Sequence, residues 1–181
     1  MRTLKYALLG QIVMGEKSGY DLMQIFGEDM SHAWYASHSQ IYPELRKMVA
    51  EGLIGYETEI QGKVLEKKVY AATEKGRKEF EKWMNQTTTI TSSPKDEFRL
   101  KLMYLSCVSP ESFLPRIQEQ IAYRSKRMEK QVAVMAKYKE PPEDLEELGN
   151  YLALKGSLLK EESYIAWLRF CEDTLSERCK K

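Results

Sequence analysis

The sequence predicts a mainly α-helical fold with a two-stranded β-hairpin near the middle of the chain. Two observations support this fold class. Apolar residues recur at helical spacing through most of the sequence, whereas between residues 53 and 72 their period changes to two, as in half-buried strands. After a polar stretch around residue 90 the helical period returns and continues. With 43% hydrophobic and 30% charged residues, the 181-residue chain can bury a core and expose long solvated helices.

Short helices are predicted before the hairpin. The first covers residues 3–14, and its apolar face consists of Leu4, Leu8, Leu9 and Ile12. A signal peptide is the alternative for this segment, but Gln11 interrupts the apolar run and no small-residue cleavage site follows. Ser18 is expected to cap the second helix, residues 18–30. Its inward residues are expected to be Leu22, Ile25 and Phe26.

The third helix, residues 38–51, contains a proline near its start, and Gly52 is a suitable stop. Its buried face is predicted from three residues at helical spacing, Ile41, Leu45 and Met48. With Ser39 or Gln40 as the N-cap, Pro43 falls in the first turn, where most backbone N–H groups have no intrahelical partner. We therefore interpret this segment as a stiffened helix tip that presents polar side chains outward.

Two alternating segments, residues 53–60 and 64–72, flank the turn Gln61-Gly62-Lys63 and predict a β-hairpin. Thr73 is a suitable N-cap for a fourth helix, residues 74–86. Three helices followed by a hairpin is the element order of a winged helix-turn-helix. In such folds the third helix enters the major groove of DNA, and the hairpin tip contacts the backbone or the minor groove.

The polar stretch QTTTITSSP, residues 86–94, predicts a linker, and the chain beyond it is predicted to be helical. A serine followed by a proline suits a helix start and occurs twice, at Ser93-Pro94 and at Ser109-Pro110. Asp96 adds an acid at the start of the first of these helices. The second helix is much longer, with an apolar stripe of Leu114, Ile117, Ile121, Met128, Val132 and Met135. The segment KEPPEDL then forces a turn, and a final helix covers residues 143–176.

The final helix has apolar residues on more than one face. One stripe consists of Leu148, Leu152 and Leu159, and another of Tyr151, Leu158, Ile165 and Leu168. The preceding helix can bury one stripe, and a second copy of the chain is the simplest cover for the other; packing of the N-terminal part there is the alternative. We therefore expect a winged helix-turn-helix DNA-binding domain at 1–86, a linker at 87–93 and a helical dimerisation domain at 94–181.

The candidate DNA-contacting residues lie on the third helix and on the hairpin. Once the buried face is fixed, the residues expected to face outward are Ser37, Ser39, Gln40, Glu44 and Lys47. Glutamine suits a bidentate contact to adenine, serine can donate to a base or a phosphate, and a tyrosine hydroxyl can reach a phosphate. The candidates are Ser37, His38, Ser39, Gln40, Tyr42, Lys47, Lys63, Lys67 and Lys68. The alternatives that Ser39 is only a cap and Tyr42 only a core residue stay open.

Charge alone does not indicate a nucleic-acid partner. The formal net charge is +1, and residues 37–82 contain nine Lys or Arg against eight Asp or Glu. The hairpin lysines supply the local positive charge that the whole chain lacks, and a solvated hairpin is the alternative interpretation. Because each neutralised phosphate releases counterions, we expect DNA binding to weaken steeply with salt.

Several short motifs follow one another along the N-terminal half of the chain at characteristic spacings. They are Leu8-Leu9-Gly10, Gly19-Tyr20, Tyr42-Pro43-x-Leu45, Glu51-Gly52-Leu53-Ile54, and Tyr70 with Thr73-x-x-Gly76. Together they resemble the PadR family of bacterial transcriptional regulators over about residues 1–85. Residues 93–181 resemble, through less specific motifs, the long helical C-terminal domain of one PadR subgroup related to virulence activators. The resemblance implies a homodimer that binds double-stranded operator DNA, usually represses, and in many members is released by a small molecule.

The resemblance leaves room for a small aromatic or drug-like effector. Trp34, Tyr35, Trp83 and Trp167 are candidate pocket walls, although aromatic residues at such places are more often core, and we assign no effector-binding residue. The second hypothesis for function is a winged-helix protein-interaction module without an operator. The polar helix tip and the lysines of the hairpin argue against it.

No catalytic site, cofactor or metal site is expected. The sequence has only two histidines, and it lacks a glycine-rich phosphate loop and a GxSxG motif. Cys107, Cys171 and Cys179 have no metal-ligand spacing and are interpreted as buried or incidental residues of a reducing cytosol. Because no apolar run approaches the length of a membrane span, we expect a cytoplasmic protein without a membrane partner.

Overall fold

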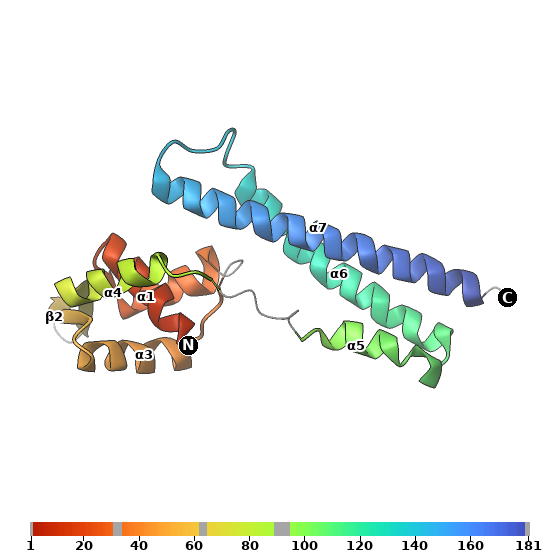
Figure 1. Ribbon diagram of the computed structural model, residues 1–181, viewed down its shortest axis with the longest axis horizontal. Helices are drawn as coiled ribbons and strands as arrows, with labels where there is room; N and C mark the ends of the chain where they lie inside the picture. The colour runs from red at the N-terminus through yellow and green to blue at the C-terminus, as the bar shows by residue number, and fades with distance from the viewer. Residues whose placement is uncertain (1, 31–33, 62–64, 89–94, 180–181) are drawn as a thin grey trace. The chain divides into compact units, whose positions relative to one another are not determined.

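The computed structural model describes residues 2–30, 34–61, 65–88 and 95–179. The chain divides into two compact units, Met1–Ile90 and Thr91–Lys181 (Figure 1). The first unit contains α1 (Thr3–Met14), β1 (Lys17–Ser18), α2 (Gly19–Gln24), η1 (Ile25–Asp29), α3 (His38–Ala50), β2 (Ile54–Gln61), β3 (Leu65–Ala72) and α4 (Glu74–Met84). The second contains α5 (Glu97–Met103), η2 (Leu105–Cys107), α6 (Pro110–Met135) and α7 (Leu145–Cys179).

The core of the first unit lies between its helices and the base of the sheet. The predicted apolar faces of the first three helices are confirmed, since the least exposed core residues are Leu8, Leu9, Ile12, Leu22, Phe26, Ile41, Leu45 and Met48. Gly52 ends α3 with a φ of 69°, and the N–H of Leu53 donates to the carbonyl of Met48 at 3.0 Å. The helix α3 thereby passes directly into the hairpin and forms one outer edge of the unit (Figure 1).

The predicted hairpin is confirmed, but the sheet has three strands and not two. β2 and β3 pair antiparallel from Ile54 opposite Ala72 to Gln61 opposite Leu65. β1 adds to the other edge of β3, giving the order β1-β3-β2. A two-residue strand has no period of its own, so hydrophobic periodicity cannot predict it.

The second helix is shorter than predicted. Its cap is confirmed, because Ser18 Oγ accepts from the N–H of Asp21 at 3.2 Å and the Asp21 carboxylate accepts from the N–H of Ser18 at 2.9 Å. The expected α-helix at 18–30 is α-helical only over Gly19–Gln24, and Ile25–Asp29 forms a π-helical turn. The wider turn keeps Leu22 and Phe26 buried, so the apolar pattern does not reveal the change.

The start of α4 is fixed to the base of the hairpin. Thr73 is its N-cap, as predicted: its hydroxyl accepts from the N–H of Gly76 at 3.0 Å and donates to the carbonyl of Gly52 at 2.8 Å. A Cβ atom at Gly76 would lie 2.0 Å from the carbonyl oxygen of Leu53. Only glycine lets this turn of the helix approach the backbone that connects α3 to β2.

In the second unit α6 and α7 run side by side and antiparallel (Figure 1). Their core consists of Phe113, Ile117, Leu168 and Leu175, with Phe98 and Leu102 of α5 packed against it. The cap Ser109 is confirmed, because its hydroxyl accepts from the N–H of Ser112 at 3.3 Å. The first helix of this unit begins later than predicted: its N-cap is Asp96, whose carboxylate accepts from the N–H of Arg99 at 2.9 Å. Ser93 and Pro94 lie outside the described residues.

A polar layer lies between α6 and α7. Glu161 is buried and pairs with Arg124 at 2.9 Å and with Arg127 at 3.5 Å, and the guanidinium of Arg124 lies 3.5 Å from the ring centre of Tyr164. Burial, with the hydrogen bond that Tyr164 donates to Asp96, raises the pKa of Tyr164 to about 12. A buried ion pair that loses one partner is strongly destabilising, so this layer disfavours any other register of the two helices.

The apolar prediction for α6 is correct at Ile117 and wrong at Val132, which is 49% exposed. Gln131 takes the inward position, where its Nε2 donates to Ser157 Oγ at 3.0 Å. On α7 the stripe of Leu158, Ile165 and Leu168 is buried, whereas Leu152 and Leu159 of the other predicted stripe stay 59% and 53% exposed. None of the helices in the described ranges is long and apolar enough to cross a membrane.

The contact at Gly76 gives a direct test of the first unit. Gly76→Ala should lower the free energy of unfolding by about 2 kcal/mol or more, because its Cβ overlaps the Leu53 carbonyl and one backbone must shift. Gly55→Ala is the matched control, since nothing lies within 4 Å of its Cβ, and a change of about 0.5 kcal/mol or less is expected. Urea denaturation measures both. Equal stability of the two variants would contradict the close approach.

Candidate nucleic-acid interface

The N-terminus of α3 is capped by side chains of its own first turn. Ser37 is the N-cap, and Gln40 Oε1 accepts from the N–H of Ser37 at 3.0 Å and from its hydroxyl at 3.2 Å. The expectation that Ser39 or Gln40 caps the helix is therefore wrong, although all three side chains lie at the tip. A bidentate contact of Gln40 with adenine needs its carbonyl oxygen, so it would require the amide to leave the cap, whereas Nε2 stays available as a donor.

Pro43 lies deeper in the helix than predicted. Because α3 begins at His38, the proline is the sixth helical residue and not part of the first turn. It donates no N–H to the carbonyl of Ser39, four residues earlier, and the exposed position of Ser39 lets solvent or a ligand donor reach that carbonyl instead. The proline thus leaves an extra backbone acceptor on the outer face of α3.

The outermost stripe of α3 opposes the buried residues and contains an arginine that the sequence interpretation missed. Ser39, Pro43, Arg46 and Ala50 recur at intervals of four, three and four residues, and Ser39, Arg46 and Ala50 are exposed. Lys47, a predicted candidate, is also exposed and lies beside this stripe. The helical period could have predicted the exposure of Arg46, because a residue two positions before the buried Met48 points to the opposite side of a helix.

Glu44 does not face outward, contrary to expectation. It is 8% exposed, and one of its oxygens accepts from Arg2 Nε at 2.9 Å and from Arg2 Nη2 at 2.5 Å. Arg2 also donates to the Glu51 carboxylate at the C-cap of α3. The residue just before α1 therefore neutralises Glu44 and Glu51, and local sequence patterns cannot predict contacts between positions 42 and 49 residues apart.

Tyr42 is half-buried beside the start of α2. A Cβ atom at Gly19 would lie 2.8 Å from both Cε1 and the hydroxyl oxygen of Tyr42, so glycine is needed for the ring to lie there. The His38 ring also packs against the Tyr42 ring, with ring centres 4.5 Å apart. The Tyr42 ring therefore contacts the protein on α2 and on its own helix.

Tyr70 of β3 packs between α3 and the hairpin. It is 5% exposed, and burial raises the pKa of its hydroxyl above the usual value. Its ring meets that of Tyr56 with ring centres 5.8 Å apart, and Lys68, Tyr42 and Arg46 lie near enough to act on the hydroxyl electrostatically. Two of them contact each other directly, since Lys68 Nζ lies 4.2 Å from the centre of the Tyr56 ring. The result is a mixed aromatic and basic surface that continues from α3 onto the hairpin.

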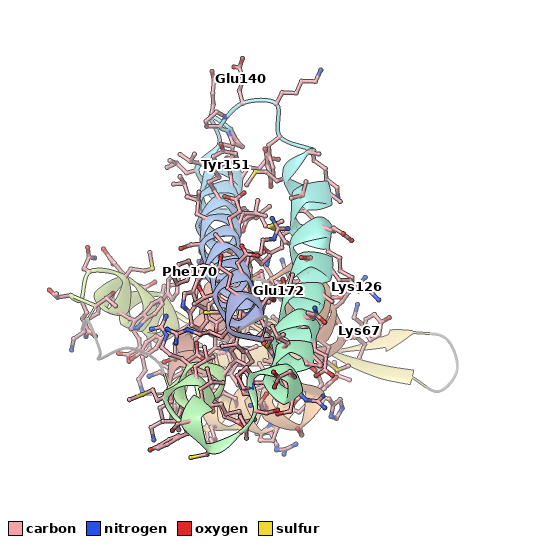
Figure 2. All side chains as sticks on the ribbon, turned by 90° about the vertical axis from the view of Figure 1, so that its right-hand side faces the viewer. Lys67, Lys126, Glu140, Tyr151, Phe170 and Glu172 are labelled. Carbon is pink, nitrogen blue, oxygen red and sulfur yellow. The ribbon has the colours of Figure 1, made fainter. Side chains whose placement is uncertain are left out.

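The two described hairpin lysines point to opposite faces of β3, as neighbours in a strand must. Lys68 lies on the face of Tyr56 and Tyr70. Lys67 projects from the other face (Figure 2), and its Nζ lies 3.7 Å from a carboxylate oxygen of Asp21 at the start of α2. Lys67 is therefore close to an acid of the protein, whereas Lys68 lies over an aromatic ring. Lys63, the third predicted hairpin contact, lies outside the described residues.

The aromatic residues considered for an effector pocket are engaged in packing where they are not exposed. The Trp83 ring stacks on Tyr6 with centres 4.8 Å apart. Trp167 meets the edge of Tyr164 at 4.9 Å, whereas Trp34 and Tyr35 are 41% and 67% exposed. Among the described residues no group of three or more His, Cys, Asp or Glu side chains could hold a metal ion.

Comparison with known proteins covers both units. Residues 8–82 match the transcriptional regulator PadR-like family, and residues 94–176 match the virulence activator alpha C-terminal family. The chain is 38% identical over 172 residues to the negative transcriptional regulator PadR of Bacillus subtilis, covering 93% of this chain and 94% of that protein.

Solved structures agree with the sequence comparison. B. subtilis PadR in complex with operator DNA matches with a TM-score of 0.88 at 36% identity, covering 96% of this chain and 99% of that one. The same B. subtilis protein in complex with p-coumaric acid matches with a TM-score of 0.82 at 33% identity, covering 97% and 99%. Both units are thus matched in order along nearly the whole chain, and the protein belongs to the PadR-like family of transcriptional regulators.

Proposed function

We propose that this protein is a sequence-specific repressor that binds a palindromic operator as a homodimer and is released by a small aromatic effector. The observation that carries the proposal is the 38% identity, over nearly the full length, to a negative regulator that has been solved in complex with operator DNA. In this proposal residues 1–86 bind DNA, 87–93 connect, and 94–181 dimerise. The protein would act in the cytoplasm, where chromosomal operators of bacteria are accessible.

The exposed side of α3 and the hairpin would form the DNA-binding surface. Arg46 and Lys47 offer cations, and Ser39 and Gln40 offer donors at the helix tip. Tyr42 and Lys68 extend the surface toward the hairpin, with Ser37, His38, Lys63 and Lys67 as the remaining candidates. Because the net charge is only +1, binding would depend on these few side chains and not on a general positive field.

Dimerisation would place two copies of α3 on one face of the DNA. The exposed leucines of α7, at positions 145, 152 and 159, recur every seven residues and form a stripe that a single chain leaves uncovered. An equivalent stripe of a second copy would cover it through a two-fold axis. The two recognition helices would then lie about 34 Å apart, one turn of DNA, as a palindromic operator requires.

A salt-dependent gel shift with DNA from upstream of the protein's own coding sequence tests operator binding. A sequence-selective complex that weakens steeply with salt is expected. Gln40→Ala should change sequence preference, by about 1–3 kcal/mol at the contacted base pair, and Tyr42→Phe should weaken binding evenly across sequences. Lys160→Ala on α7 is the control and should bind as the parent does. Absence of any selective complex would favour a protein-interaction module.

Charge placed on the exposed stripe of α7 should break the dimer. Leu152→Glu with Leu159→Glu is expected to give a folded monomer in sedimentation, with operator affinity reduced by two orders of magnitude or so because both half-sites are no longer bound together. Lys160→Glu adds negative charge to an exposed position of the same helix and should leave the dimer intact. A double variant that remains dimeric would place the interface elsewhere.

Release by p-coumaric acid should be measurable as loss of the operator complex, since the acid is bound in the structure of the B. subtilis relative. The tryptophan fluorescence of the free protein should change over the same concentration range if binding and release are linked. Cinnamic acid, which lacks the phenol hydroxyl, is the matched control and should act more weakly. A protein that keeps its operator at saturating p-coumaric acid would need another effector class.

A further inference from the structure

We propose that Arg2 is a positioning residue for operator binding, because it holds Glu44 and Glu51 away from Lys47 and so leaves Lys47 free for a phosphate. This inference rests on the proposed function of α3. It concerns a residue outside the recognition helix and the hairpin, and it assigns Arg2 an indirect role.

The positions of Glu44 and Glu51 on either side of Lys47 create the problem that Arg2 solves. Glu44 lies three positions before Lys47 and Glu51 four positions after it, so both acids lie on the same side of the helix as the lysine. Carboxylates at these intervals form ion pairs with a lysine within a helix. Without the Arg2 guanidinium, Lys47 would pair with either Glu44 or Glu51 and would present a neutral pair to DNA.

The geometry shows where the two acids go instead. Arg2 Nε and Nη2 donate to one Glu44 oxygen at 2.9 and 2.5 Å, and Arg2 Nη1 donates to Glu51. These hydrogen bonds are the leading cause of a raised pKa of Arg2. The Glu44 side chain is only 10% exposed, whereas Lys47 is exposed and forms no ion pair with any residue that the structure describes.

A guanidinium suits this task better than an ammonium. Its planar fork of donors can serve two carboxylates at once, and here one edge meets Glu44 while the third nitrogen meets Glu51. The two acids are two helical turns apart, so one arginine also fixes the rotation of α3 relative to the start of α1. Both effects serve the outward presentation of Lys47.

The test compares Arg2→Ala and Lys47→Ala in full-length protein by operator gel shift over a range of salt. Each variant should lose roughly tenfold in affinity and lower the salt slope by about two, one phosphate contact per protomer. The double variant should bind no more weakly than either single variant. Additive losses would overturn the inference, since the two residues would then act independently.

Neutralising the acids separates positioning from a general loss of structure. In the Arg2→Ala background, Glu44→Gln with Glu51→Gln should restore affinity, and adding Lys47→Ala should remove it again. The matched control is Glu74→Gln with Glu81→Gln on α4, which changes the charge equally but should restore nothing. Arg2→Lys should rescue partly. Failure of the first pair to restore binding would mean that Arg2 contacts DNA itself or only stabilises the fold.

A measurement without DNA keeps this inference distinct from the proposed function. The side-chain NMR signal of Lys47 should shift on Glu51→Gln in the Arg2→Ala protein and stay in place on the same change in the parent. If the NMR result is as expected but the gel shift finds no operator that the protein binds, the proposed function fails and the competition of Lys47 with Arg2 for Glu51 stands. If Lys47 is equally sensitive in both proteins, or if Lys47→Ala does not weaken an established operator complex, the inference is wrong.

Discussion

The burial of Ile41, Leu45 and Met48 is the constraint on which the candidate nucleic-acid interface depends. All three have no exposed surface, so α3 cannot rotate about its axis without opening the core of the first unit. A fully buried side chain of this size contributes about 1.5–3 kcal/mol, which makes even a one-residue rotation costly. The direction of every other residue of α3 follows from these three, including the outward stripe with Arg46.

The hairpin is held to α3 through a second, smaller set of contacts. Gly52 carries the chain directly from the end of α3 into β2, and Thr73 ties the far end of β3 back to the same turn. Tyr70 then fills the angle between helix and sheet. Because these contacts all lie at the base of the hairpin, they fix the plane of its strands relative to α3, and with it the position of Lys68.

The sequence predicted the periodic features of this protein well, because a period of 3.6 or two reports which residues face a core. The faces of α1, α2 and α3, the hairpin and the caps Ser18, Thr73 and Ser109 are confirmed on this basis. Features without a period were missed: the strand Lys17–Ser18, the π-turn after Gln24, and the cap of α3 at Ser37. The burial of Glu44 was missed for a different reason, since its partner lies 42 residues away.

The low net charge makes the placement of each basic residue near α3 important. A chain with a net charge of +1 has no general field to attract DNA, so each basic residue near α3 counts only if no acid of the protein neutralises it. The structure treats its basic residues unequally. Lys5 pairs with Glu79 at 3.0 Å and Lys67 lies near Asp21, whereas Arg46 and Lys47 form no ion pair within the described ranges. Glu44 and Glu51 lie beside Lys47 and could neutralise it, but Arg2 donates hydrogen bonds to both acids. In the proposed mode of operator binding, recognition depends as much on where the carboxylates are held as on where the cations point.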